Sequence, residues 1–188
     1  AQINKETNNS DELRLQTISN LGIDFQISVE ELQKTSEFVL AEKLYDEAYA
    51  SYISKSQAIV NKILPLLKQL LKNRGAVVQN IMVPFTDGIK QIGVSVNLQE
   101  SVNSRGLMII SEMEKIITVA IIDQLWKEHL RDMDDLKQSV QNAVYEQKDP
   151  LLIYKFEGFE MFKLFIGKAK QETMSLLVKS EIPIHNEH

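Results

Sequence analysis

Cysteine is absent from this chain of 188 residues, and glycine and proline are scarce, with seven and four residues. Without cysteine the chain forms no disulfide and no cysteine-based zinc site, and the same absence favours a reducing compartment such as the cytoplasm. The few glycines form no Gly-x-x-x-x-Gly-Lys-Ser/Thr loop. The chain is therefore not expected to bind ATP through a phosphate-binding loop.

Long hydrophobic runs are also missing. The longest uncharged apolar run in the C-terminal half, residues 116–122, is far shorter than the roughly 20 residues that a transmembrane helix needs. The N-terminal residues 1–10 are mostly polar and lack the apolar centre of a signal peptide. We expect no transmembrane segment, and we interpret the start of the chain as a frayed end.

Charge of one sign does not cluster. The net charge is −5, with 21 Lys and Arg against 26 Asp and Glu, and 44% of the residues are hydrophobic. Binding to nucleic acid phosphates needs grouped basic residues, whereas here the basic residues alternate with acidic ones. The composition predicts a globular chain that does not bind nucleic acid.

The first part of the chain predicts two short helices. Residues 10–21 form the first, and Gly22 ends it, since glycine readily adopts the left-handed conformation that closes a helix. Residues 28–31 read Ser-Val-Glu-Glu, which has the Ser-x-x-Glu form of a capping box and so predicts the start of the second.

Two longer apolar patterns follow. Residues 36–52 carry apolar side chains at helical spacing, and residues 59–71 form a second apolar stretch interrupted by Pro65. Proline removes a backbone donor and clashes with the preceding turn, so we expect Pro65 to kink this helix or to begin a new one.

Residues 77–106 contain the only β structure that we expect. Two runs of alternating apolar residues flank the turn sequence Asp87-Gly88, which predicts a β-hairpin. A hairpin alone is marginal in water, so its apolar face should pack on the neighbouring helices. The alternating residues are Ile81, Val83 and Phe85, then Ile92, Val94, Val96 and Leu98.

The C-terminal half predicts two long antiparallel helices joined by the turn 145–150. Asp149 followed by Pro150 combines an N-cap residue with a proline at the first helical position. Apolar residues recur in steps of three and four, which predicts one stripe on each helix. The first stripe comprises Ile109, Met113, Ile116, Val119, Ile122, Trp126, Leu130, Met133, Leu136, Val140 and Val144, and the second Leu152, Phe156, Phe159, Phe162, Ile166, Ala169, Thr173 and Leu176.

No set of residues with catalytic character stands out. His129 is the only histidine outside the polar tail, and a histidine without a placed partner is most simply structural or surface-exposed. Asp132, Asp134 and Asp135 point in different directions on a helix, so they cannot converge on one metal ion. Phe156, Phe159 and Phe162 fit the seam of the helix pair, and Trp126 fits the seam or an anchor on a neighbouring surface.

Several sequence motifs in the C-terminal half of the chain resemble those of the bacterial preprotein translocase motor SecA. They are LWKEHL at 125–130, the turn YEQKDP at 145–150, and YKFEGFEMF at 154–162. The resemblance is close over 109–183 and looser over 11–74. It implies a mainly α chain, with a small helical wing domain at 1–106 that carries an inserted hairpin near 77–106. A two-helix finger of the scaffold domain at 107–183 and a tail at 184–188 follow.

The resemblance also implies a function. In the SecA family, ATP hydrolysis at two nucleotide-binding domains drives unfolded preproteins through the SecYEG channel, and the loop of the finger contacts the moving polypeptide. Carried over to this sequence, the loop is Tyr145, Glu146, Gln147 and Lys148, and the shaft and scaffold contacts are Trp126, Lys127, His129, Phe156 and Phe159.

By this resemblance the chain is a fragment of a larger protein, which its start without methionine fits. It is then no enzyme itself and holds no cofactor, since ATP and magnesium belong to the motor domains. Its partners are the other SecA domains, preprotein and SecYEG, on the cytoplasmic side of the inner membrane. The sequence differs from the family's pattern at 142–144 and 151–153, beside the turn.

Two other classes of function stay open. The chain could be an independent helical module that dimerises through the seam, or a hydrolase of unfamiliar type, although no nucleophile and base are paired in the sequence. We expect the chain alone to be a monomer or weak dimer. Its apolar faces at Ile110, Ile117 and Ile121 should be left uncovered where other domains would sit.

Overall fold

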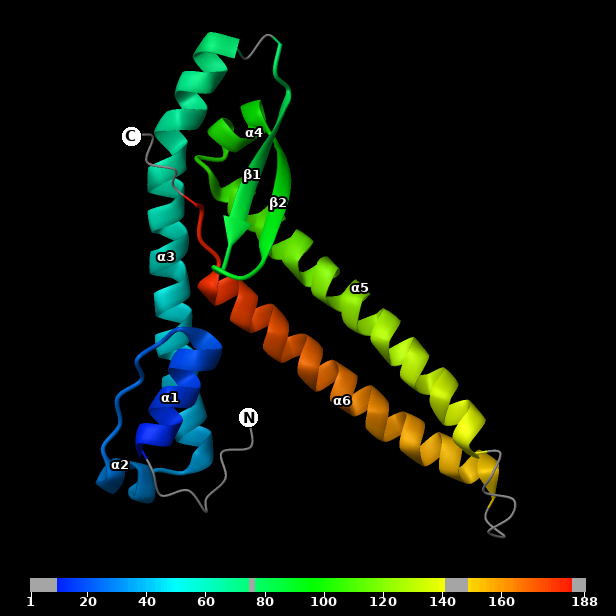
Figure 1. The fold of residues 1–188 in the computed structure, drawn as a ribbon. Coiled ribbons are helices and arrows are strands. Elements are labelled where there is room, and N and C mark those ends of the chain that lie inside the picture. Colours follow the sequence, from blue (N-terminus) through cyan, green and yellow to red (C-terminus); the bar gives the residue numbers. More distant parts are fainter. Residues whose placement is uncertain (1–9, 75–76, 141–148, 184–188) are drawn as a thin grey trace. The chain divides into compact units, whose positions relative to one another are not determined.

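The computed structural model describes residues 10–74, 77–140 and 149–183 (Figure 1). The chain divides into two compact units. Unit 1 comprises Ala1–Glu114 and Ser175–His188, and unit 2 comprises Lys115–Met174. The described residues form six helices and one two-stranded sheet, so the prediction of a mainly α fold with a small hairpin is confirmed. The division into wing and scaffold domains is a separate matter and stays a prediction.

Unit 1 begins with two short helices, as predicted. α1 spans Ser10–Leu21, and Gly22 follows it with a φ of 65°. α2 spans Val29–Lys34, and the Ser28 hydroxyl accepts a hydrogen bond of 3.2 Å from the backbone N–H of Glu31. Apolar side chains from α1, from the segment that leads to α2 and from α3 form a small core, namely Leu13, Ile23, Phe25, Leu40 and Ala48.

The third helix excludes one of the two outcomes expected at Pro65, the start of a new helix, whereas a kink at this proline stays a prediction. α3 runs from Glu37 to Arg74 with Pro65 inside it, so the two predicted apolar patterns belong to one helix and no new helix begins at the proline. Ile63 and Leu67, on either side of the proline, are both buried. Their burial on one face offsets the lost backbone hydrogen bond, because tertiary packing routinely overrides local propensity.

The predicted hairpin is present. β1 (Asn80–Thr86) pairs antiparallel with β2 (Gln91–Asn97), and the side chains of Val83, Phe85, Val94 and Val96 are buried. The alternating pattern placed Leu98 in the second strand, but the structure does not. Leu98 begins a short helix, α4 (Leu98–Asn103), because the Asn97 side chain accepts a hydrogen bond of 3.0 Å from the N–H of Glu100.

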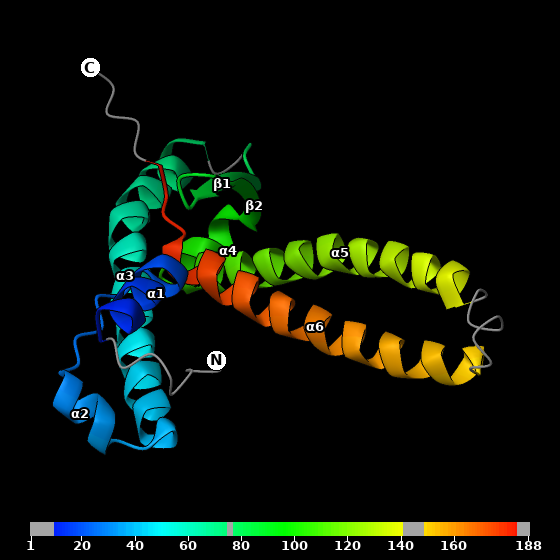
Figure 2. The same ribbon diagram turned by 60° about the horizontal axis from the view of Figure 1, so that its bottom comes forward.

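Two long helices complete the chain. α5 spans Leu107–Ser139 and α6 spans Pro150–Lys179, and within unit 2 they run side by side in opposite directions (Figures 1 and 2). The predicted start of α6 is confirmed, since the Asp149 carboxylate accepts a hydrogen bond of 2.9 Å from the N–H of Leu151.

Candidate functional site

Over residues 119–130, the helix pair of unit 2 packs through a different row of α5 from the one predicted. Leu125, His129 and Leu136 are buried, whereas Trp126 is 42% exposed and Leu130 is also exposed. The predicted stripe was therefore wrong between Val119 and Leu130 by a rotation of about one residue, since neighbouring helical positions lie roughly 100° apart. Its later members Leu136 and Val140 are buried, as predicted. Ile110, Ile117 and Ile121, which we expected to be uncovered, are buried as well.

The same correction applies to the first half of the α6 stripe, whereas its later members Ala169 and Leu176 are buried, as predicted. Phe156 and Phe159 are 65% and 59% exposed, so they do not form the seam. The side that faces α5 carries Gly158 instead, and a Cβ atom there would lie 3.0 Å from the Met133 methyl carbon. Both helices carry apolar residues on more than one face, so spacing alone allowed several stripes. In the structure, the Met133 side chain fills the space beside Gly158 and marks the side of α6 that meets α5.

An aromatic cluster lies at the middle of this helix pair. The imidazole of His129 is surrounded by rings, with centroids 5.3 Å from Phe165, 6.0 Å from Phe162 and 5.4 Å from Trp126. The histidine residue is only 8% exposed. These contacts support the structural interpretation of His129, since they are packing contacts with aromatic carbon and not with an acid or base.

One flank of the pair is polar. Lys168 of α6 lies 3.1 Å from the Glu128 carboxylate of α5, and this hydrogen bond lowers the pKa of Glu128 and raises the pKa of Lys168. Both groups are well exposed to solvent, where ion pairs contribute little stability. The ion pair therefore shows which sides of α5 and α6 face each other, but it adds little to the stability of the helix pair. Lys127 also lies at the surface, 2.6 Å from Asp123.

The opposite flank is apolar. On α5, Glu128 lies on one side of the row through Leu125 and His129, and Trp126 lies on the other. Because Glu128 meets Lys168, the remaining sides of both helices share the second flank, which agrees with the contact between His129 and Phe162. We name this surface the apolar flank. It comprises the exposed side chains Val119, Ile122, Trp126, Leu130, Phe159 and Phe162.

The predicted loop residues Tyr145, Glu146, Gln147 and Lys148 lie outside the described residues. Their proposed contact with a polypeptide stays a prediction. Of the predicted shaft residues, the structure brings Trp126 and His129 into one cluster and leaves Lys127, Phe156 and Phe159 exposed.

A polar clamp in unit 1 was not predicted. The hydroxyl of Tyr52 on α3 donates a hydrogen bond of 2.6 Å to Glu114 on α5. One turn further along α3, the Lys55 ammonium donates to the carbonyl of Val178 at 2.9 Å and lies 3.4 Å from the Glu181 carboxylate. One turn of α3 thus holds both helices that continue into unit 2. No local pattern links residues 62 positions apart, so this hydrogen bond could not be predicted from the sequence.

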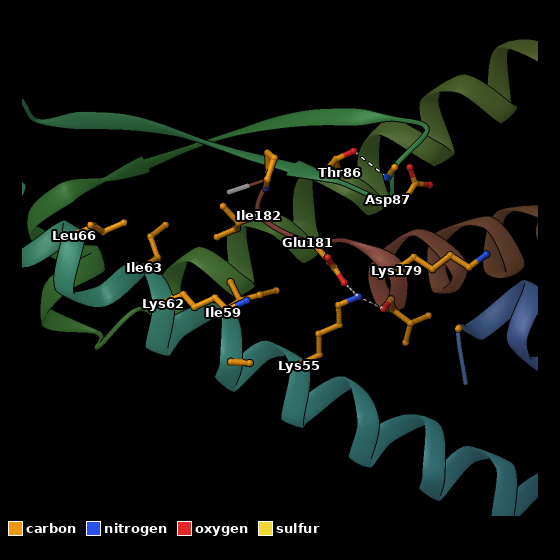
Figure 3. A pocket seen from close by; sticks show the side chains of 15 residues that line it. Lys55, Ile59, Lys62, Ile63, Leu66, Thr86, Asp87, Lys179, Glu181 and Ile182 are labelled. Carbon is orange, nitrogen blue, oxygen red and sulfur yellow. Dashed lines mark hydrogen bonds and ion pairs between the residues drawn. The ribbon is translucent and has the colours of Figure 1, made fainter. Parts of the chain in front are cut away.

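The clamp lies beside an open groove of about 1170 Å³ in unit 1. Figure 3 shows Ile59, Ile63 and Leu66 of α3 on one side and Ile182 of the C-terminal segment near them, with Lys55 reaching Glu181. The lining is mostly aliphatic and offers no paired nucleophile and base. In the described ranges, no three His, Asp or Glu side chains are placed to hold a metal ion.

No helix within residues 10–74, 77–140 and 149–183 combines the length and apolar character that crossing a membrane requires.

Comparison with known proteins gives a consistent family. Residues 1–181 match the SecA Wing and Scaffold domain. The chain is 43% identical over 177 residues to the protein translocase subunit SecA of Cytophaga hutchinsonii, which covers 94% of this chain. It is 42% identical over 182 residues to that of Christiangramia forsetii, which covers 97%. The chain spans 16% of the length of each of these relatives. No solved structure matches.

Proposed function

The chain belongs to the SecA family, as its wing and scaffold region, and from this premise we propose that it couples ATP hydrolysis to preprotein movement. The relatives are named protein translocase subunits, which assigns the chain a part in protein translocation. In this proposal the chain has no catalytic residues of its own, and the parent protein binds ATP and magnesium in its other domains.

The observation that carries the proposal is the continuity of α5 and α6. Each helix passes from unit 1 into unit 2 without a break, α5 at Glu114 and α6 at Met174. An unbroken helix transmits a displacement along its axis, because a sharp bend would break the backbone hydrogen bonds at the point where it bends. Two such helices, both held by α3, suit the transfer of motion to a loop at their far end.

That loop, Tyr145 to Lys148, is proposed to contact the unfolded preprotein at the cytoplasmic mouth of the SecYEG channel. A tyrosine offers apolar contact together with a polar group, so it suits a partner whose side chains vary along its length. The protein would then work on the cytoplasmic side of the inner membrane and associate with it peripherally, through the channel.

The apolar flank is proposed as the surface that other domains of the parent protein or the channel cover. Trp126 and Phe159 lie on this flank and are about half-exposed in the chain alone. Exposed aromatic residues gathered on one side of a helix pair are typical of an interface. The flank therefore gives two of the predicted shaft residues, Trp126 and Phe159, a common surface, and His129 packs behind it.

The test uses the full-length parent protein with serine in place of Phe159. Leu164 is the matched control, because it is 73% exposed on the same helix but on the side of Lys168. We expect Phe159→Ser to lower ATP-driven transport roughly tenfold, which corresponds to about 1.4 kcal/mol of lost burial. Leu164→Ser should transport normally, and both variants should keep basal ATP hydrolysis. Equal transport by the two variants would contradict the proposal.

The apolar flank also favours a second function, dimerisation of the chain. If two copies bind each other through the flank, sedimentation should show a stable dimer of the isolated chain that Phe159→Ser dissociates and Leu164→Ser does not. A monomer at micromolar concentration would leave the coupling function as the single candidate.

A further inference from the structure

The hairpin of unit 1 has two edges, and the edge of β1 is protected. Thr86 exchanges two backbone hydrogen bonds with Glu181, of 2.8 and 2.7 Å, where the C-terminal segment passes beside β1 (Figure 1). In an antiparallel strand the backbone groups alternate in direction, so Pro84 faces the same way as Thr86. Continued pairing would bring Pro183 opposite Pro84, and proline has no N–H to donate. The edge of β1 therefore pairs with one residue of the C-terminal segment, and this pairing cannot extend into a longer strand.

The edge of β2 carries no such protection. By the same alternation, Gln91, Gly93 and Ser95 direct their backbone N–H and C=O groups away from β1. All three residues are exposed, none is proline or charged, and within the described part of the chain no other backbone segment is bonded to them. Proteins usually block an open edge with proline, charge or a covering segment. Here only one of the two edges has been blocked.

We propose that the outer edge of β2, defined by Gln91, Gly93 and Ser95, binds an extended polypeptide segment as a third strand of the hairpin. Each of the three residues offers one donor and one acceptor, and such bonds recognise backbone whatever its side chains are. An added strand would also place every second side chain next to the buried row of Val94 and Val96.

The chemistry of this edge fits an unfolded polypeptide of varied sequence. Gln91, Gly93 and Ser95 are small or uncharged, so they exclude neither acidic nor basic neighbours in an incoming strand. The choice of an unfolded protein as the partner rests on the proposed function in translocation. The edge geometry does not, because it depends on the hairpin alone.

The first test measures peptide binding to the 188-residue chain. The probe is a fluorescent ten-residue peptide of alternating Thr and Val with lysine at both ends, and fluorescence anisotropy reports its affinity. The control peptide carries N-methyl groups on two adjacent central amides, which removes a donor from each of its edges and keeps every side chain. We expect the control to bind at least tenfold more weakly. Equal affinity of the two peptides would overturn the proposal.

The second test changes the protein. Ser95→Pro removes an outward N–H without removing a hydrogen bond between β1 and β2, as Pro84 already does on the other strand. Ser95→Ala keeps the N–H and is the matched control. We expect Ser95→Pro to weaken binding of the unmodified peptide roughly tenfold, and Ser95→Ala to leave it unchanged. Similar affinities for all three proteins would overturn the proposal.

Two further outcomes are informative. If amide exchange shows that Ser95→Pro disturbs Val94 and Val96, the N-methylated peptide still tests the edge on the unchanged protein. If the chain instead dimerises through this edge and binds no peptide, the assignment of a polypeptide partner is wrong. Neither result bears on transport by the Phe159 and Leu164 variants, so the coupling function is tested separately.

Discussion

Replacing Tyr52 by phenylalanine tests the clamp on α5. The change removes one hydroxyl and keeps the ring, so the lost interaction is the hydrogen bond of 2.6 Å to Glu114. A hydrogen bond to a charged group contributes about 1.5–3 kcal/mol when well buried. Because Tyr52 is half-buried, we expect a loss of about 1–2 kcal/mol in the free energy of unfolding. For a chain of this size the melting temperature should fall by roughly 2–8 °C.

The pH dependence identifies the group responsible. Burial and then the bond to Glu114 raise the pKa of Tyr52 above its ordinary value, so the folded state holds this proton more tightly than the unfolded chain. Its contribution is complete below about pH 10, the ordinary tyrosine pKa, and is lost as the pH rises through the folded-state pKa. The difference between the unchanged protein and Tyr52→Phe should therefore be constant from pH 7 to 9 and shrink above pH 10.

Urea unfolding at pH 8 and pH 11 measures both effects. Tyr49→Phe is the control, since Tyr49 lies on the same helix with its side chain exposed, and this change should leave the free energy of unfolding unaltered within about 0.5 kcal/mol. The reasoning fails if Tyr52→Phe is as stable as the unchanged protein at pH 8, or if the difference between them grows above pH 10.

Two more predictions concern packing at other points of α3, α5 and α6. Lys55→Met should lower the free energy of unfolding by about 1 kcal/mol in urea titrations, because the carbonyl of Val178 loses its donor. An unchanged free energy of unfolding would show that this half of the clamp contributes nothing to stability. Gly158→Ala should raise the free energy of unfolding by about 0.5–1 kcal/mol through helix propensity, and so the melting temperature by roughly 1–4 °C. The Met133 methyl group that the new Cβ atom approaches ends a flexible side chain and can move aside. A lower melting temperature would mean that the helices cannot accept one more carbon atom there.

The features that the sequence predicted well are those set by neighbouring residues. Asp149 and Pro150 marked the start of α6, and the two runs of alternating apolar residues around Asp87-Gly88 marked the hairpin. In each case the residues that decide the structure lie within a few positions of one another. Pro65 is the exception, since its local preference was outweighed by the burial of Ile63 and Leu67, which depends on distant packing.

The candidate site was harder to predict because its features depend on which helix faces meet. α6 carries Phe156, Phe159 and Phe162 at helical spacing, yet the side that meets α5 carries Gly158 and Phe165. The aromatic spacing was real, but Phe156 and Phe159 are exposed and do not form the seam. The clamp formed by Tyr52 and Lys55 could not be predicted for a related reason, because its partners Glu114 and Val178 lie far away along the chain.

This distinction helps to interpret other helix pairs of the same kind. A helix that must both pack on its neighbour and contact a partner carries two apolar stripes, and period alone cannot rank them. Burial in the folded helix pair can, because the Gly158 backbone lies against the Met133 side chain while Phe159 stays exposed. Trp126 and Phe159 are therefore the residues of the helix pair whose replacement should tell most about function, because they are large, apolar and still exposed after the helices have packed.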